Sequence, residues 1–303
     1  MNLGPVGIWT YELDTRPAAQ MQAGVVELES LGYGAVWLPD GFGREPLANA
    51  GLALAASDRI TVATGVASIH SRGAWSMAAA QLTLTEAYPD RFLLGLGVSH
   101  GPLVEGLRGG AYGRPLAAMS DYLDAMDEAS FPFAAPAPTP GRRVLGALGP
   151  KMMALAGARA DGAHPYLATV EHTASARAIL GLGPLLAPQV AVMLEEAPGR
   201  ARQRGRAFLS MYLGLPNYQR HLARLGFGPD DLADGGSDRL IDAVVGWGPV
   251  DDVAKRVQAH LTAGADHVAV QVIGPVPGEP PLDEWRALAP ALVQPNGTSP
   301  HQG

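Results

Sequence analysis

Short apolar segments bounded by turn residues alternate with longer segments of helical spacing along almost the whole chain. Strands that alternate with helices form parallel βαβ units, because a parallel strand needs a crossover connection to reach its neighbour. The candidate strands are residues 6–10, 31–38, 60–67, 92–97, 144–148, 158–164, 190–194 and 263–270, and the clearest helices are 74–88 and 250–263. Eight strands of this kind predict an α/β fold, a (β/α)8 TIM barrel.

Glycines at the helix-to-strand connections support this prediction. Gly32, Gly162 and Gly264 each lie where a helical segment gives way to an apolar strand. We expect each to lie at or near a helix C-cap, where glycine adopts left-handed backbone angles at no steric cost. The alternative is a Rossmann-type open sheet. Its Gly-x-Gly-x-x-Gly turn after the first strand is missing, because residues 4–7 precede or open that strand.

The length of the chain fits a single barrel domain with additions. The sequence has 303 residues, of which 47% are apolar, and a barrel needs ~250 residues. We expect one domain over residues 1–295 and a flexible tail at 296–303. Residues 197–247, between the seventh and eighth strands, exceed one loop and one helix, which predicts extra helices over the barrel mouth. Residues 131–141 are rich in Pro and Ala and predict an exposed connection.

Charge and composition exclude several classes of function. The 22 Lys and Arg residues against 29 Asp and Glu residues give no basic surface for nucleic acid. The absence of cysteine excludes disulfides, thiolate metal sites and thiol nucleophiles. The start of the chain lacks the pattern of a secretory leader and no apolar run suggests a membrane span, so we expect a cytoplasmic enzyme.

In a (β/α)8 barrel the active site is built from residues that directly follow the strands. The histidines there show no paired ligand spacing, and we expect no metal site. Neighbours on a strand point to opposite faces, so adjacent glutamates at 195–196 do not form the carboxylate pair of a glycosidase. The positions after the strands that are candidates for such a site are Trp9, Tyr11, Asp40, Ser68, His70, Ser99, His100, Gly149 to Lys151, His164 to Thr169, Glu195, Glu196 and Gln271.

Two of these positions are candidate proton-transfer groups. His100 follows a strand whose glycines, Gly95 and Gly97, would permit close approach of a flat ligand. It is either a proton donor or acceptor or a histidine of a surface loop. Asp40 is either a carboxylate that orients a ligand or a turn and helix-capping residue.

The segment around Gly149, Pro150 and Lys151 is a candidate phosphate cradle. It joins a strand to a helix with proline near the first helical position, which leaves backbone N–H groups free beside a lysine. A Gly-Pro helix start also occurs for purely structural reasons.

Taken together, these strand ends resemble the luciferase-like superfamily, and within it the F420-dependent oxidoreductases of actinobacteria. The similarity runs through nearly the whole chain. Its markers are LGYGAVWLPD at 31–40, VATGVASIHSR at 62–72, DRFLLGLGVSH at 90–100 and LGALGPKM at 145–152, with subgroup-like segments at 161–166 and 213–218.

The resemblance implies a deazaflavin, coenzyme F420, bound across the barrel mouth, and hydride transfer to or from a small organic substrate. His100 would be the acid or base and Asp40 an orienting carboxylate, although some members carry Glu at one or the other position. A non-prolyl cis peptide is expected between Gly65 and Val66, behind the ring. The implied cofactor-binding residues are Asp40, Gly65, Val66, Ala67, Ser99, His100, Leu148, Gly149, Pro150, Lys151, Tyr166 and Thr169.

Two alternatives stay open at the level of sequence. An FMN-dependent luciferase-like monooxygenase would use the same fold, and a barrel without chemistry could serve as a flavin-binding protein. We expect a homodimer with a small-molecule substrate and no nucleic-acid or membrane partner.

Overall fold

The computed structural model describes residues 1–41, 43–106 and 109–293. The strands of this part of the chain form one parallel sheet. In chain order they are β1 (Val6–Trp9), β2 (Ala35–Leu38), β3 (Thr61–Thr64), β4 (Ala67–Ser68), β5 (Phe92–Gly97), β6 (Arg142–Leu145), β7 (Gly162–Ala163), β8 (Leu185–Leu186), β9 (Gln189–Leu194), β10 (Val245–Gly248) and β11 (Val268–Val272).

The sheet curls into a barrel through the segment that carries β8 and β9. On one side of this segment, the Ala187 N–H donates to the Ala163 carbonyl of β7, at 2.9 Å. On its other side, the Pro188 carbonyl accepts from the Ala269 N–H of β11, also at 2.9 Å. Because β11 pairs with β1, and β1 continues through β2, β3, β5 and β6 to β7, the predicted (β/α)8 barrel is confirmed. All eight predicted strands contribute to it.

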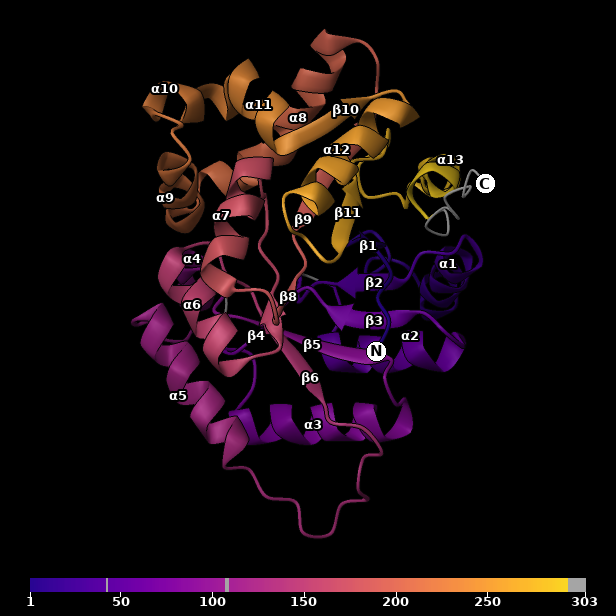
Figure 1. Cartoon of the computed structure of the whole chain (residues 1–303), viewed down its shortest axis with the longest axis vertical. Helices are drawn as coiled ribbons and strands as arrows, with labels where there is room; N and C mark the ends of the chain where they lie inside the picture. Colours follow the sequence, from indigo (N-terminus) through magenta and orange to yellow (C-terminus); the bar gives the residue numbers. More distant parts are fainter. Residues whose placement is uncertain (42, 107–108, 294–303) are drawn as a thin grey trace, which may run out of the picture.

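Helices surround this sheet (Figure 1). Several begin at a proline in the first turn, where the missing N–H costs no hydrogen bond. The helices of the barrel are α1 (Ala18–Ser30), α2 (Pro46–Ala56), α3 (Ala74–Ala87), α4 (Gly101–Gly106), α5 (Pro115–Asp127), α6 (Pro150–Arg159), α7 (Val170–Leu180), α12 (Val250–Thr262) and α13 (Leu282–Leu292). None of the described helices is long and apolar enough to cross a membrane.

The predicted extra helices between the seventh and eighth barrel strands are confirmed. They are α8 (Pro198–Leu213), α9 (Pro216–Arg224), α10 (Pro229–Leu232), a 3-10 turn at Ala233–Gly235 and α11 (Asp238–Val244). The strand β10 in this region was not predicted. It pairs with residues 191–194 of β9, whereas β11 pairs with residues 189–192 of the same strand. Its sequence, Val-Gly-Trp-Gly, has too few apolar residues to mark it as a strand.

The barrel interior contains histidines as well as apolar side chains. The Trp37 ring stacks on the His164 ring at 4.3 Å between centroids, and the Trp37 indole N–H donates to His267 Nε2 at 3.0 Å. Burial lowers the pKa of both imidazoles to about 4, so both are neutral at neutral pH. His164, a candidate for the barrel mouth, is therefore part of the core.

Two of the three predicted C-cap glycines are confirmed. Gly32 and Gly264 have positive φ angles, 89° and 106°. Gly162 differs, because it lies in β7, and a Cβ atom there would stand 2.1 Å from the Leu185 carbonyl oxygen. Close approach of two strands, rather than the end of a helix, therefore requires this glycine.

The ends and connections follow the sequence in part. Residues 131–141 contain no helix or strand and are largely exposed, as predicted. The single domain over residues 1–295 stays a prediction. The expected tail at 296–303 lies outside the described residues.

Candidate active site

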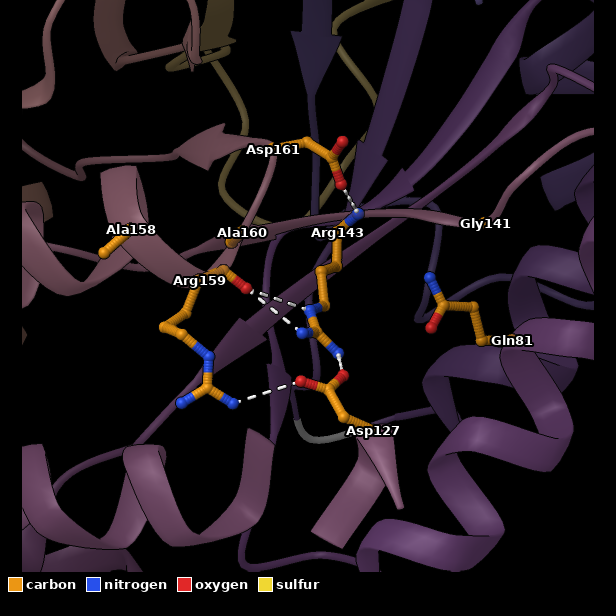
Figure 2. Close-up of a pocket in the computed structure, with 8 residues that line it drawn as sticks. All are labelled: Gln81, Asp127, Gly141, Arg143, Ala158, Arg159, Ala160 and Asp161. Carbon is orange, nitrogen blue, oxygen red and sulfur yellow. Dashed lines mark hydrogen bonds and ion pairs between the residues drawn. The ribbon is translucent and has the colours of Figure 1, made fainter. Parts of the chain in front are cut away.

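Two cavities lie at the N-terminal ends of the barrel strands. The first has a volume of about 470 Å³, and Figure 2 shows that Asp127 and Arg159 in its lining both bond to Arg143. Arg143 pairs with Asp127 at 2.7 Å, and its backbone N–H donates to Asp161 at 2.9 Å. The second cavity, of about 600 Å³, shares Asp161 and reaches Leu185. These polar groups already bond to one another. The candidate active site is therefore at the opposite, C-terminal ends of the strands.

At the end of β3 the peptide bond between Gly65 and Val66 is cis, as predicted. The Trp9 indole N–H donates to the Gly65 carbonyl at 2.8 Å. A Cβ atom on Gly65 would stand 2.7 Å from that indole nitrogen. Glycine is therefore required where the Trp9 side chain of β1 packs against the end of β3 at the barrel mouth.

The Val66 side chain explains the glycines of β5. A Cβ atom on Gly97 would stand 2.4 Å from a Val66 methyl group, and one on Gly95 would stand 2.0 Å from the Thr64 carbonyl oxygen. The expectation that these glycines leave room for a flat ligand is wrong, because the protein itself fills that space.

Asp40 anchors the segment that follows β4. Its Oδ2 accepts hydrogen bonds from the Ser68 N–H and the Ser71 hydroxyl, both at 2.9 Å. The carboxylate therefore joins the end of β2 to residues 68–71. Asp40 and Ser68, both named from the sequence, come together at the barrel mouth.

His100 is part-buried after β5 and faces the inserted helices. Its Nδ1 lies 3.0 Å from Asn217 Oδ1, and its ring centroid lies 5.4 Å from that of Tyr218. Burial lowers the pKa of the imidazole, against the opposing effect of the Asn217 hydrogen bond. The neighbouring Ser99 has a φ angle of 56°, and its carbonyl accepts from the Tyr112 hydroxyl at 3.1 Å.

Tyr166 centres an aromatic network at the mouth. Its hydroxyl donates to Gln271 Oε1 at 2.6 Å and lies 2.7 Å from the Tyr212 hydroxyl, which must then be the donor of that second bond. Its ring lies 5.2 Å from the Trp9 ring. Burial raises the pKa of Tyr166 well above its ordinary value, so the phenol stays protonated.

The N-terminus of α6 is the place where the sequence predicts an anion site. Gly149 is the N-cap and offers no side-chain hydrogen bond to the first turn, and Pro150 follows it. The Arg224 guanidinium of α9 lies beside it, at 3.4 Å from the position of a Cβ on Gly149. Burial lowers the pKa of Arg224, and the positive charge of nearby Arg220 lowers it further. Exposed Lys151 adds a third cation to this end of the helix.

Two other residues named for the cofactor have structural partners. The Leu148 carbonyl lies 3.2 Å from His172 Nε2. The Thr169 hydroxyl accepts from the His172 N–H at 3.2 Å and so caps α7. Its side chain is buried.

Glu195 and Glu196 do not join the candidate site. Glu195 is bonded to Arg200 at 2.8 Å and Glu196 is exposed, which agrees with the exclusion of a paired-carboxylate site. The His70 ring lies beside Tyr112, at 5.7 Å between centroids. The described residues contain no cluster of His, Cys, Asp and Glu side chains that could hold a metal ion.

Sequence reasoning missed two buried carboxyl groups after β1. Glu12 accepts from the Thr10 hydroxyl at 2.7 Å, and burial raises its pKa. Asp14 accepts from the Asn49 amide at 2.7 Å, and burial raises its pKa to about 7. Their place directly after a barrel strand was the available signal.

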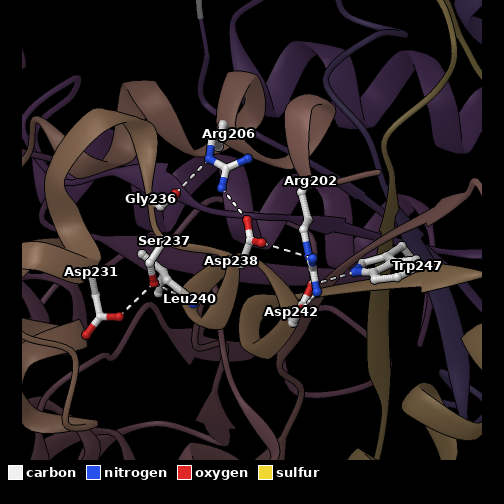
Figure 3. A network of polar contacts seen from close by, with 9 residues as sticks. All are labelled: Arg202, Arg206, Asp231, Gly236, Ser237, Asp238, Leu240, Asp242 and Trp247. Carbon is white, nitrogen blue, oxygen red and sulfur yellow. Dashed lines mark hydrogen bonds and ion pairs between the residues drawn. The ribbon is translucent and has the colours of Figure 1, made fainter. Parts of the chain in front are cut away.

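Sequence reasoning also missed Asn217, Arg220 and Arg224, because the position of the inserted helices over the barrel is a tertiary feature. Polar contacts brace this insertion (Figure 3). Arg202 of α8 pairs with Asp238 at 2.9 Å and with Asp242 at 2.7 Å, and both aspartates lie in α11.

A family model described as luciferase-like monooxygenase matches residues 5–267. No curated protein sequence matches the chain.

Solved structures resemble the fold at low sequence identity. An F420-dependent secondary alcohol dehydrogenase in complex with an F420–acetone adduct has a TM-score of 0.76 at 15% identity, covering 95% of this chain and 99% of that one. A coenzyme F420 dependent tetrahydromethanopterin reductase from Methanopyrus kandleri has a TM-score of 0.70 at 14% identity, covering 96% and 98%. The oxygenating constituent of 3,6-diketocamphane monooxygenase from Pseudomonas putida, in complex with FMN, has a TM-score of 0.66 at 16% identity, covering 94% and 96%.

Proposed function

Because this chain belongs to the luciferase-like monooxygenase family, we propose that it is an oxidoreductase that transfers a hydride between coenzyme F420 and a small organic substrate. One observation carries this proposal. The N-terminus of α6 has no side-chain cap and lies beside Arg224, at the same barrel mouth as the imidazole of His100. One short helix, α9, contacts both groups. The first group suits an anion and the second suits proton transfer.

The residues at the mouth fit a phosphorylated flavin-like cofactor. Backbone N–H groups at the start of α6 are free of side-chain caps, and Arg224, Arg220 and Lys151 supply positive charge. These groups would hold the phosphate, while the segment around Gly65 and Trp9 would support the ring. When bound, the deazaflavin supplies the hydride acceptor or donor.

The chain's own residues would then act on the substrate and its proton. His100, neutral because it is part-buried, would exchange a proton with the substrate oxygen or carbon. Asp40 would act by holding residues 68–71 against the ring rather than by transferring a proton, because its Oδ2 is bonded to that segment. The network of Tyr166, Tyr212 and Trp9 would exclude water from the reaction.

A second candidate is an FMN-dependent monooxygenase, which one of the similar structures favours through its bound FMN. Fluorescence titration of the purified protein with each cofactor separates the two. We expect F420 to bind more tightly, and F420 to be reduced or its reduced form oxidised when a suitable substrate is present. Equal or tighter binding of FMN would favour the monooxygenase.

We also propose that the chain is a homodimer. The helix α2 contains no charged residue, and it exposes Ala48, Leu52 and Ala55 at helical spacing. A stripe of small apolar side chains of this kind suits helix packing between two copies.

A further inference from the structure

The helix α9 presents a row of polar side chains to the barrel beside its buried Tyr218 and Leu222. Asn217, His221 and Arg224 are spaced i, i+4 and i+7, which places them on one face of the helix. Asn217 contacts His100, His221 lies 4.5 Å from the His172 ring, and Arg224 lies beside Gly149. One face of a nine-residue helix therefore spans the reactive end and the anion end of the candidate site.

The contact between Asn217 and His100 defines where the imidazole carries its proton. The two atoms, Nδ1 of His100 and Oδ1 of Asn217, lie 3.0 Å apart. An amide oxygen only accepts hydrogen bonds, so Nδ1 must be the donor. In a neutral imidazole, a proton on Nδ1 leaves Nε2 with a free lone pair.

Two further features keep this arrangement in place. Pro216 begins α9 and restricts the backbone directly before Asn217, so the amide belongs to a fixed first turn. The Tyr218 ring packs on the imidazole at 5.4 Å between centroids, and Tyr218 is itself buried.

We propose that Asn217 is a positioning residue, which holds His100 in the tautomer protonated on Nδ1 and so leaves Nε2 as the atom that accepts the substrate proton. The use of Nε2 in a reaction rests on the proposed oxidoreductase function. The tautomer itself does not, and it can be measured without cofactor or substrate.

The direct test is ¹⁵N NMR of the histidine side chains in the full-length apoprotein. The chain has eight histidines, and the signals of His100 are identified by their loss in His100→Gln. In the wild type at neutral pH we expect Nδ1 to be protonated and Nε2 to be bare. In Asn217→Leu, which removes the acceptor but keeps an isosteric side chain, we expect a mixture with the Nε2-protonated form.

Asn217→Asp provides the conservative rescue. A carboxylate accepts the same hydrogen bond, so His100 should keep its proton on Nδ1, and the added negative charge should raise its pKa above that of the wild type. Gln219→Leu is the matched control, because Gln219 lies on the same helix and bonds to the Leu213 carbonyl at 2.7 Å instead of to His100. It should leave the signals of His100 unchanged.

A wild-type His100 protonated on Nε2, or a tautomer that Asn217→Leu leaves unchanged, would overturn the proposal. Failure of the protein to bind either cofactor would overturn the proposed function and leave the tautomer result standing. With an active enzyme, Asn217→Leu should lower kcat by about 10- to 100-fold, a part of the ~10²–10⁴-fold that an acid–base group contributes, while cofactor affinity stays within about twofold. In Asn217→Asp the acid limb of the pH profile should move to higher pH.

Discussion

His100, Tyr166 and Asp14 share one property at the barrel mouth, which is that burial favours their uncharged forms. The charges lie at the other end of the site, on Arg220 and Arg224 beside the start of α6. A reaction zone in which burial favours the uncharged forms of these three groups, next to a cationic anchor, suits a ligand with a neutral ring and an anionic tail.

The role of His100 can be tested by His100→Ala. If the imidazole exchanges the substrate proton, turnover should fall by ~10²–10⁴-fold, because general acid–base groups contribute about this much. The dissociation constant of the cofactor should change far less, since the phosphate is held elsewhere. Steady-state kinetics and fluorescence titration on the same preparation measure both quantities, and unchanged turnover would return His100 to the role of a loop histidine.

Asp14 gives a prediction about stability and pH. Its carboxyl group accepts from Asn49, while Asp14 Oδ2 and Asn49 Oδ1 are both buried without a protein partner. A proton on Oδ2 would satisfy both oxygens as an acid–amide pair. The folded pKa of about 7 lies above the ordinary value of 3.8, so this group's stabilisation is present below pH 3.8 and is lost as pH rises to about 7.

Asp14→Asn removes this titration and keeps both hydrogen bonds, as an amide–amide pair. At pH 8 we expect the variant to be more stable than the wild type by on the order of 1–2 kcal/mol, and at pH 4 to be equally stable. Thermal unfolding at the two pH values measures the difference. A variant less stable than the wild type at pH 8 would show that Asp14 is ionised and bound by a cation.

At the scale of elements, α6 would supply the proposed anion site and α9 would complete it. Arg224→Gln should therefore raise the dissociation constant of the cofactor by about 10- to 100-fold, the equivalent of one hydrogen bond between charged groups, and less at high salt. Gly149→Val should also weaken binding, because a Cβ at this position already meets Arg224 at 3.4 Å.

Arg142→Gln is the control for this pair of variants. Arg142 is exposed at the start of β6, at the opposite end of the barrel. Its replacement should leave affinity unchanged. If neither Arg224→Gln nor Gly149→Val changes the dissociation constant, the phosphate lies elsewhere.

The barrel strands and the two helices at 74–88 and 250–263 could be predicted from the sequence, because a buried parallel strand is a short apolar run and its crossover helix has an independent period. The strand β10 could not be predicted, since its pairing with β9 is decided by tertiary contacts. Asn217 and Arg224 could not be predicted as site residues for the same reason. These two residues are polar positions on a helix that also buries Tyr218 and Leu222, whereas sequence patterns identify a buried face by its apolar residues.

At the scale of the whole molecule, the proposed homodimer can be tested by a substitution in α2, the helix without charged residues. Leu52 is 38% exposed and lies between the exposed Ala48 and Ala55 on one helix face. Leu52→Glu should convert a dimer into a monomer with unchanged helical content, because a charge in an apolar interface loses its hydration. Sedimentation velocity and circular dichroism measure the two properties. A monomeric wild type would contradict the proposal.

The most direct test of the proposed cofactor site is a crystal structure of the protein with F420. We predict that the phosphate lies at the N-terminus of α6 within hydrogen-bonding distance of Arg224, and that the deazaflavin ring lies between the cis peptide at Gly65–Val66 and His100. A cofactor bound at the N-terminal ends of the strands, or with its phosphate away from α6, would contradict this account.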